Sequence, residues 1–238
     1  MENASKALLI AGSVLITLAI ISLLVFGYEG LSEWQQTVDD SEQTRTDTEF
    51  MRQVEQFNRD LYGSELLSLM NYVEDYNARL AGDGYAEIEF NVQIRRDIQG
   101  TSEYFTSGNY DLQALYDEVK GPNGIETRIE QYEEPNSDYN EKSVRYYWTK
   151  TYREIASEFG ITVPSDTPTS ELESTILDAA GLQAHTIEDL IADIREYDLL
   201  DSIYTQFREG KRFEPDPDNG FVYDNDNGRI IEINFVEI

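Results

Sequence analysis

The segment Gly63 to Ile94 reads GSELLSLMNYVEDYNARLAGDGYAEIEFNVQI, and it contains the change of period that decides the fold. In its first half, apolar residues recur at steps of three and four, which predicts an amphipathic helix with Ser64 as its N-cap. Residues 82–84 (GDG) predict the turn that ends it. In the second half, apolar and polar residues alternate, which is typical of a half-buried strand. The apolar positions are Leu66, Leu69, Val73, Tyr76 and Leu80, then Ile88, Phe90, Val92 and Ile94. A helix followed by such a strand indicates an α+β fold.

C-terminal to this segment, the sequence predicts a series of short elements. We expect a helix over Asp111 to Lys120, ended by Gly121 and Pro122, and a strand over residues 125–132. Residues 144–159 combine strand-favouring aromatics with a helical stripe, so we expect them to start as strand and finish as helix.

Two helix starts and a hairpin are predicted in the last third of the chain. Ser170 with Glu173 and Thr186 with Asp189 have the spacing of a capping box. The only histidine, His185, precedes the second box without a metal-ligand or triad pattern, so we expect it in a loop. Residues 221–223 and 229–236 flank the turn sequence DNDNG, which predicts a C-terminal β-hairpin. Residues 63–238 are therefore expected to form an acidic α+β head of antiparallel strands packed with helices.

N-terminal to the head, residues 28–62 are expected to form a helical stalk. Two apolar stripes with helical spacing occur in it, separated by a polar gap over residues 39–49. We expect these stripes to mediate helix–helix association. They comprise Leu31, Trp34 and Val38, then Phe50, Val54 and Phe57.

Residues 1–27 are expected to form a transmembrane anchor in the lipid bilayer. The stretch ALLIAGSVLITLAIISLLVF, from Ala7 to Phe26, carries no charge and has about the length that spans the hydrocarbon of a bilayer. Lys6 before the span and acidic residues after it favour an extracellular C-terminal part. Ser13 and Thr17, one helical turn apart, offer a polar strip for packing in the membrane. A cleaved signal peptide is the alternative interpretation.

The composition excludes several classes of function. The chain has 47 Asp and Glu against 18 Lys and Arg, for a net charge of −29, and no cysteine. A binder of nucleic acid needs a basic face, so we expect no nucleic-acid partner. The lack of cysteine excludes disulfides, thiol catalysis and thiolate metal sites. The acidity fits a solvated surface, a cationic partner or cation binding.

Carboxylates are also the only candidates for chemistry. Pairs such as Glu87 with Glu89 and Glu133 with Glu134 would suit a glycosidase, but so acidic a chain contains such pairs by chance, and we expect no catalytic residue or cofactor. A weak Ca²⁺ site is a further hypothesis, because acidic residues alternate before glycine in two segments, although neither matches an EF-hand and turn formation explains both. Its residues would be Asp216, Asp218, Asp224 and Asp226.

Three segments carry a resemblance to a known group. MENASKALLIAGSVLITLAIISLLVF at the N-terminus, FNRDLYGSELLSLMNYVEDYN at residues 57–77 and GRIIEINFVE at residues 228–237 resemble uncharacterised single-pass, N-terminally anchored proteins of clostridia-like bacteria. The layout is also similar to that of type IV pilin-like proteins, although Glu2 precedes the apolar run, whereas pilins carry a glutamate within theirs. The resemblance implies an anchored α+β protein with homo-oligomer or surface-assembly partners and no assigned activity. We therefore expect a membrane-anchored structural or interaction protein; the alternatives are an anchored cell-wall hydrolase and a ligand-binding or cation-binding ectodomain.

Overall fold

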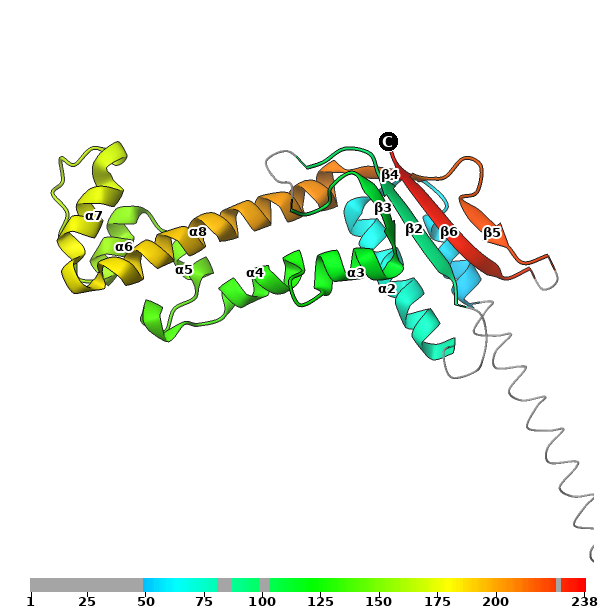
Figure 1. The fold of residues 1–238 in the computed structure, drawn as a ribbon, viewed down its shortest axis with the longest axis horizontal. Coiled ribbons are helices and arrows are strands. Elements are labelled where there is room, and N and C mark those ends of the chain that lie inside the picture. The colour runs from blue at the N-terminus through cyan, green and yellow to red at the C-terminus, as the bar shows by residue number, and fades with distance from the viewer. Residues whose placement is uncertain (1–48, 81–86, 99–102, 226–227) are drawn as a thin grey trace, which may run out of the picture. The chain divides into compact units, whose positions relative to one another are not determined.

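The computed structural model describes residues 49–80, 87–98, 103–225 and 228–238 (Figure 1). Residues 54–238 form one compact unit, and of the residues that precede it only 49–53 are described. The larger unit is α+β, with helices and a mixed sheet, which confirms the fold class expected for the head. Its strands are β1 (Leu61–Tyr62), β2 (Glu89–Ile94), β3 (Gly108–Asp111), β4 (Arg212–Pro215), β5 (Phe221–Tyr223) and β6 (Ile230–Glu237). Its α-helices are α2 (Gly63–Leu80), α3 (Leu112–Lys120), α4 (Ile125–Glu133), α5 (Val144–Trp148), α6 (Tyr152–Glu158), α7 (Leu172–Ala180) and α8 (Ala184–Thr205).

The strands pair in the order β1-β4-β6-β2-β3, and β5 also pairs with β6. The pairing of β2 with β6 is parallel, and the other pairings are antiparallel. The expectation of antiparallel strands alone is therefore wrong at the centre of the sheet. The cause is the long, mostly helical connection between β2 and β6, because a parallel pair requires a crossover and not a tight turn.

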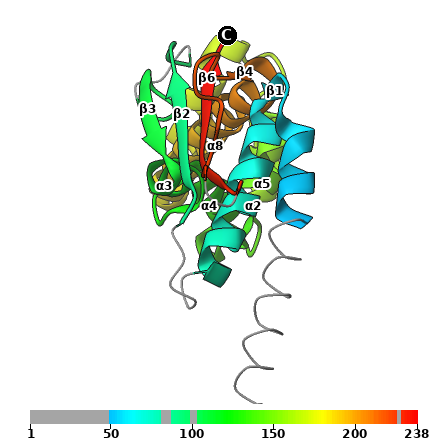
Figure 2. The same ribbon diagram turned by 90° about the vertical axis from the view of Figure 1, so that its right-hand side faces the viewer.

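Helix α2 covers one face of the sheet (Figures 1 and 2). Phe90, Val92 and Ile94 of β2 are buried, whereas Glu89 and Gln93 are exposed on the opposite face. The helix buries one side in turn, with Leu66, Leu69, Met70 and Val73 fully inaccessible. The predicted helix and strand are thus confirmed. The helix begins at Gly63, so Ser64 is not its cap; the Glu65 carboxylate instead accepts the N–H of Tyr62 at 3.0 Å.

Strand β1 lies in a part of the chain that was expected to be stalk. Leu61 pairs with Phe213 and Tyr62 with Arg212 of β4. Leu61 is fully buried, so the sheet begins before residue 63. A strand of two residues is too short for its period to be visible in the sequence.

Two further elements have the secondary structure that the sequence predicts, and a third does not. Helix α3 forms as expected, and so does the hairpin of β5 and β6. Residues 125–132, expected to be a strand, are helical as α4. Ile125 is buried and Ile129 and Tyr132 pack beside the core at helical spacing, so a short apolar pattern satisfied both periods.

The strand expected at the start of residues 144–159 is also helical. Ser143 caps α5, its hydroxyl accepting the N–H of Tyr146 at 3.1 Å. Val144 and Tyr147 are buried in a cluster with residues of α8, so packing overrides the β-propensity of the aromatics. Helix α6 follows, and Thr151 and Glu154 form a capping box that the sequence analysis missed.

Both predicted capping boxes are wrong. Helix α7 begins at Leu172 after a 3-10 turn, and Ser170 makes no cap. Helix α8 begins at Ala184, so Thr186 lies inside it and His185 is helical, not in a loop. The imidazole Nδ1 of His185 lies 3.4 Å from the Asp189 carboxylate at an exposed position. The 3-10 turns before both helices replace the caps that the spacing indicated.

Carboxylates of α4 and α8 accept hydrogen bonds from aromatic side chains. Tyrosine hydroxyls and an indole N–H are neutral donors, which suits a chain with few cations for its 47 acids. Burial raises the pKa of Tyr139 and Tyr204, and the neighbouring carboxylate raises it further. The pairs are Tyr132–Glu196, Tyr139–Asp193 and Tyr204–Glu126, each at 2.8 Å, and Trp148–Asp198 at 3.0 Å.

Candidate functional site

The predicted Ca²⁺ residues lie in turns. The carboxylate of Asp216 accepts the N–H groups of Asp218 at 2.9 Å and Asn219 at 3.1 Å, which closes the turn after β4. The main chain of Asp224 bonds to Arg229 and Gly228 at the base of the hairpin. Asp226 lies outside the described residues. In the described ranges, no three acidic or histidine side chains are grouped to hold a metal ion, so Ca²⁺ binding stays a prediction.

Of the eight residues expected to mediate assembly, only Phe50, Val54 and Phe57 are among the described residues. Phe50 and Val54 are buried, with 2% and 0% of their surface exposed, and Phe57 is partly exposed. Ser13, Thr17, Leu31, Trp34 and Val38 lie outside the described residues. The predicted anchor and most of the stalk lie there as well. Within the described part of the chain, no helix has the length and apolar composition needed to cross a membrane.

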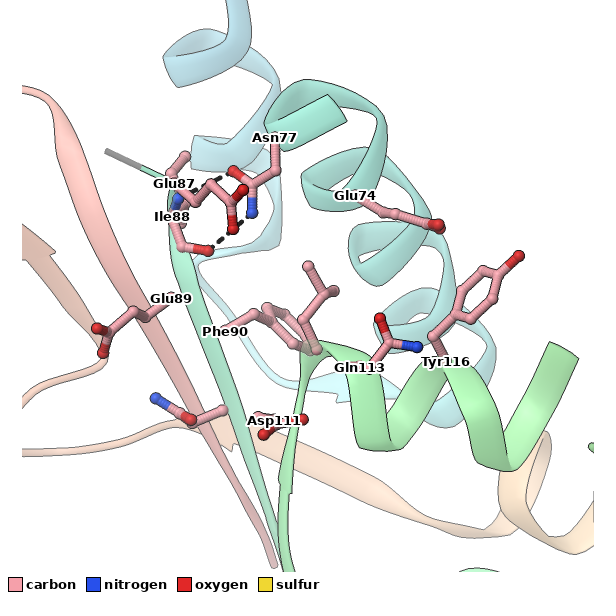
Figure 3. Close-up of a pocket in the computed structure, with 11 residues that line it drawn as sticks. Glu74, Asn77, Glu87, Ile88, Glu89, Phe90, Asp111, Gln113 and Tyr116 are labelled. Carbon is pink, nitrogen blue, oxygen red and sulfur yellow. Dashed lines mark hydrogen bonds between the residues drawn. The ribbon is translucent and has the colours of Figure 1, made fainter. Parts of the chain in front are cut away.

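A pocket of about 460 Å³ lies among α2, β2 and α3 (Figure 3). Asn77, near the end of α2, forms one of its walls. Its side-chain N–H₂ donates to the carbonyl of Ile88, and its side-chain oxygen accepts the Ile88 N–H, both at 2.9 Å. These two hydrogen bonds satisfy the polar groups of the buried Asn77 side chain and join the start of β2 to α2.

Asp111 positions the opposite wall of the pocket. It ends β3 and caps α3, its carboxylate accepting the N–H of Ala114 at 2.7 Å. A carboxylate at a helix N-terminus is favourable because it faces the positive end of the helix dipole. The cap sets the direction of α3, whose Gln113 and Tyr116 line the pocket.

The interior of the pocket is apolar and its rim is acidic. Phe90 and Ile88 are buried, and in Figure 3 Phe90 points from β2 towards α2 and Gln113. Glu74, Glu87 and Asp111 line the pocket with acidic side chains, and no Lys, Arg or His is among its lining residues. Glu89 also borders the pocket, but its side chain points to the opposite face of β2 (Figure 3). An apolar pocket with a few convergent polar groups is the usual form of a small-ligand site, and the acidic side chains give this pocket a negative potential.

Sequence reasoning found only part of this pocket. Glu87 and Glu89 form the pair of carboxylates that the sequence shows, but only Glu87 lies on the rim, because the Glu89 side chain points to the opposite face of β2 (Figure 3). Glu74 and Asp111 were not connected with them, because α2 and the end of β3 meet only through the fold. Glu133 and Glu134 are not among the lining residues.

Among the described residues, Glu118 is the carboxyl group with a raised pKa. Burial raises it, and the N–H of Phe105 donates to the carboxylate and lowers it in part. Phe105 itself is buried and stacks on Phe207 with ring centroids 3.9 Å apart. Glu118 thus holds the loop before β3 and does not line the pocket.

No protein-family model matches the chain, and comparison with curated proteins and with solved structures gave no significant match. The resemblance to N-terminally anchored bacterial proteins therefore stays a prediction from the sequence.

Proposed function

We propose that the protein is an interaction protein whose head binds a positively charged organic ligand in the pocket among α2, β2 and α3. The observation that supports this most directly is the combination of an apolar wall with the acidic side chains of Glu74, Glu87 and Asp111 and no basic residue. Leu112 offers contact to methylene groups, and the Tyr116 ring, which also lines the pocket, offers a cation–π contact. Such a lining suits an alkylammonium group, either free or at the end of a lysine side chain.

The charge of the whole chain supports the same ligand class. At −29, long-range attraction draws cations towards the protein and repels anions. The pocket adds a low-dielectric wall beside the carboxylates, which strengthens each charge interaction relative to open water. Selectivity among cations then depends on the apolar interior, which a hydrated metal ion cannot use.

The anchored hydrolase is less well supported. Glycoside hydrolysis needs a carboxylic acid of raised pKa beside a second carboxylate. Glu118 has a raised pKa, but its interactions are with Phe105 and with its buried surroundings, and no second carboxylate is among them. The binding function requires no such pair.

Membrane anchoring belongs to the proposal as its location. We propose that the span Ala7 to Phe26 holds the protein in the cell membrane with the acidic head outside, as a component of a surface assembly. The sequence supports this part, through an uncharged apolar stretch and the resemblance described above. The pocket would then face cationic partners of that assembly.

Calorimetric titration of the full chain with cadaverine, at low salt in a detergent without a sugar head group, tests the pocket. The diol analogue of cadaverine has the same length without the charges and should not bind. Glu74→Gln and Glu87→Gln should each weaken cadaverine binding about fivefold, since an exposed charge pair contributes up to about 1 kcal/mol.

Glu188→Gln is the matched control, because it removes the same charge from an exposed position on α8 that does not line the pocket. It should leave binding unchanged. Equal weakening by all three variants would show general attraction to an acidic protein and refute the pocket. Failure of cadaverine to bind the wild-type chain would also refute it.

A further inference from the structure

The face of the sheet opposite α2 has a second hollow, of about 270 Å³, over β2, β3 and β6 and beside the turn after β4. Amide side chains dominate its lining. They are Asn91 and Gln93 of β2, Asn109 of β3, Asn234 of β6 and Asn219 of the turn. The volume equals that of about nine water molecules in the liquid, which suits one sugar-sized ring.

Strand register brings four of these amides together on one face. Gln93 lies opposite Asn109 in the antiparallel pair, and Asn91 lies opposite Asn234 in the parallel pair. Residues two apart on a strand share a face, so Asn91 and Gln93 point the same way. The result is two cross-strand pairs of amides on three adjacent strands, staggered along β2, with a strand spacing of roughly 4.8 Å.

Two of the four amides are fixed by hydrogen bonds. The Asn91 side chain donates to the side-chain oxygen of Asn234 at 3.1 Å, and the Asn234 side chain donates to the carbonyl of Asn219 at 2.7 Å. The side chains of Gln93 and Asn109 are exposed and make no hydrogen bond to another described residue. Each of them offers two N–H donors and a carbonyl acceptor to a ligand.

This chemistry selects a neutral ligand with several hydroxyl groups. A hydroxyl both donates and accepts, as an amide does, and a row of amides can therefore bond to adjacent hydroxyls of one ring. Asp216 lines the hollow and no Lys or Arg does, which disfavours phosphate, sulfate and carboxylate ligands. Peptide addition to the sheet is excluded here, because β2 and β6 already have a strand on both sides.

We propose that the open face of the sheet binds a neutral carbohydrate through Asn91, Gln93, Asn109 and Asn234. This site is independent of the cationic pocket, because it lies on the other face of the sheet. Asn91 borders both cavities, whereas Gln93 and Asn109 line only the hollow. These two residues therefore separate the two sites in an experiment.

Calorimetric titration of the full chain with soluble trisaccharides of chitin, cellulose and starch, in a detergent without a sugar head group, tests the proposal. At least one trisaccharide should bind. The double variant Gln93→Ala/Asn109→Ala should weaken that binding about tenfold or more, because it removes at least two hydrogen bonds to the ligand. Cadaverine binding should not change in this variant.

Gln183→Ala is the matched control, since it removes an exposed amide from the turn before α8. If the alanine variant is unfolded by circular dichroism, Gln93→Glu/Asn109→Asp keeps the side-chain shape and removes the N–H donors, and it should weaken binding as well. No binding of any of the three trisaccharides, or equal binding by wild type and the folded double variant, would overturn the proposal.

Discussion

The ammonium group of Lys211 lies 2.9 Å from the carboxylate of Glu237, and both residues are buried, with 8% and 2% of their surface exposed. The same carboxylate accepts the backbone N–H groups of Arg95 at 2.8 Å and Arg96 at 3.0 Å. The end of β6 is thus joined to the segment after β2 and to the start of β4. Removal of one partner from a buried ion pair leaves the other charge without compensation.

Glu237→Gln should lower the free energy of unfolding by about 3 kcal/mol, the lower end of the cost of breaking a buried pair. The amide keeps the shape of the side chain, but it removes the charge that compensates Lys211 and replaces one of the two acceptor oxygens with an N–H₂ donor. Urea denaturation followed by circular dichroism measures the change. Glu214→Gln on β4, whose side chain makes no hydrogen bond or ion pair to a described residue, should change the stability by less than about 0.5 kcal/mol. Equal effects of the two variants would contradict the role of the pair.

The stabilisation by Glu237 should depend on pH in the acid range. Burial opposes its ionisation, but Lys211 and the N–H groups of Arg96 and Arg95 outweigh burial and hold its pKa below the ordinary 4.5. Because the pKa is lower in the folded state, the stabilisation is present above about pH 4.5 and is lost as the pH falls through the folded-state pKa. The difference in stability between wild type and Glu237→Gln should therefore shrink as the pH falls below 4.5. A constant difference down to pH 2 would argue against ionisation of Glu237 as its source.

The tyrosine–carboxylate pairs should limit stability at alkaline pH. Burial first, and the bond to Glu126 second, raise the pKa of Tyr204 above the ordinary 10.0. The folded state therefore keeps the proton that the unfolded state loses, so the stabilisation is present below about pH 10 and falls as the pH rises above it. Tyr204→Phe should cost about 1.5 to 3 kcal/mol at neutral pH, the range for hydrogen bonds to charged groups. The cost should diminish above pH 10, as thermal melts across pH will show. Tyr223→Phe, at an exposed position, is the control.

Gly63 should not accept a side chain. A Cβ atom there would lie 2.1 Å from the backbone oxygen of Phe207, which cannot move without displacing the turn after α8. Gly63→Ala should therefore destabilise the unit by about 1 to 3 kcal/mol or more, the usual cost of overpacking. At Gly108, the same Cβ would meet no atom within 4 Å, and Gly108→Ala should be close to neutral. The melting temperatures of Gly63→Ala and Gly108→Ala test the close approach of Gly63 to Phe207. Equal melting temperatures would disprove it.

The sequence predicted elements best where its pattern was long or had a clear turn. Helix α2 and strand β2 each show one period over several repeats, and the hairpin of β5 and β6 surrounds a strong turn sequence. The pattern failed over residues 125–132 and 144–148, where a few apolar residues satisfied both periods and contact with α8 selected helix. Propensity cannot anticipate such contacts, because they form only in the folded chain.

The pocket and the amide hollow were less accessible to prediction. The hollow depends on the parallel pair of β2 and β6, which has no local signal in the sequence, and the pocket depends on the packing of α2 and α3 beside β2. Glu87 and Glu89 are visible as a pattern, but Glu74 joins them only when α2 folds back on β2. Gln93 and Asn109 become neighbours only through register.

The central position of β6 also sets the order in which the strands can pair while the chain is synthesised. Asn91 and Asn234 are in contact although 143 residues separate them, and β6 lies between strands made much earlier and shortly before it. While the ribosome is still adding β6, β2 and β4 have no partner between them, and their apolar side chains have no completed sheet in which to be buried. Loop closure over such a distance slows folding. A chaperone that shields β2 during synthesis should therefore increase the yield of this protein more than that of a protein built from local hairpins.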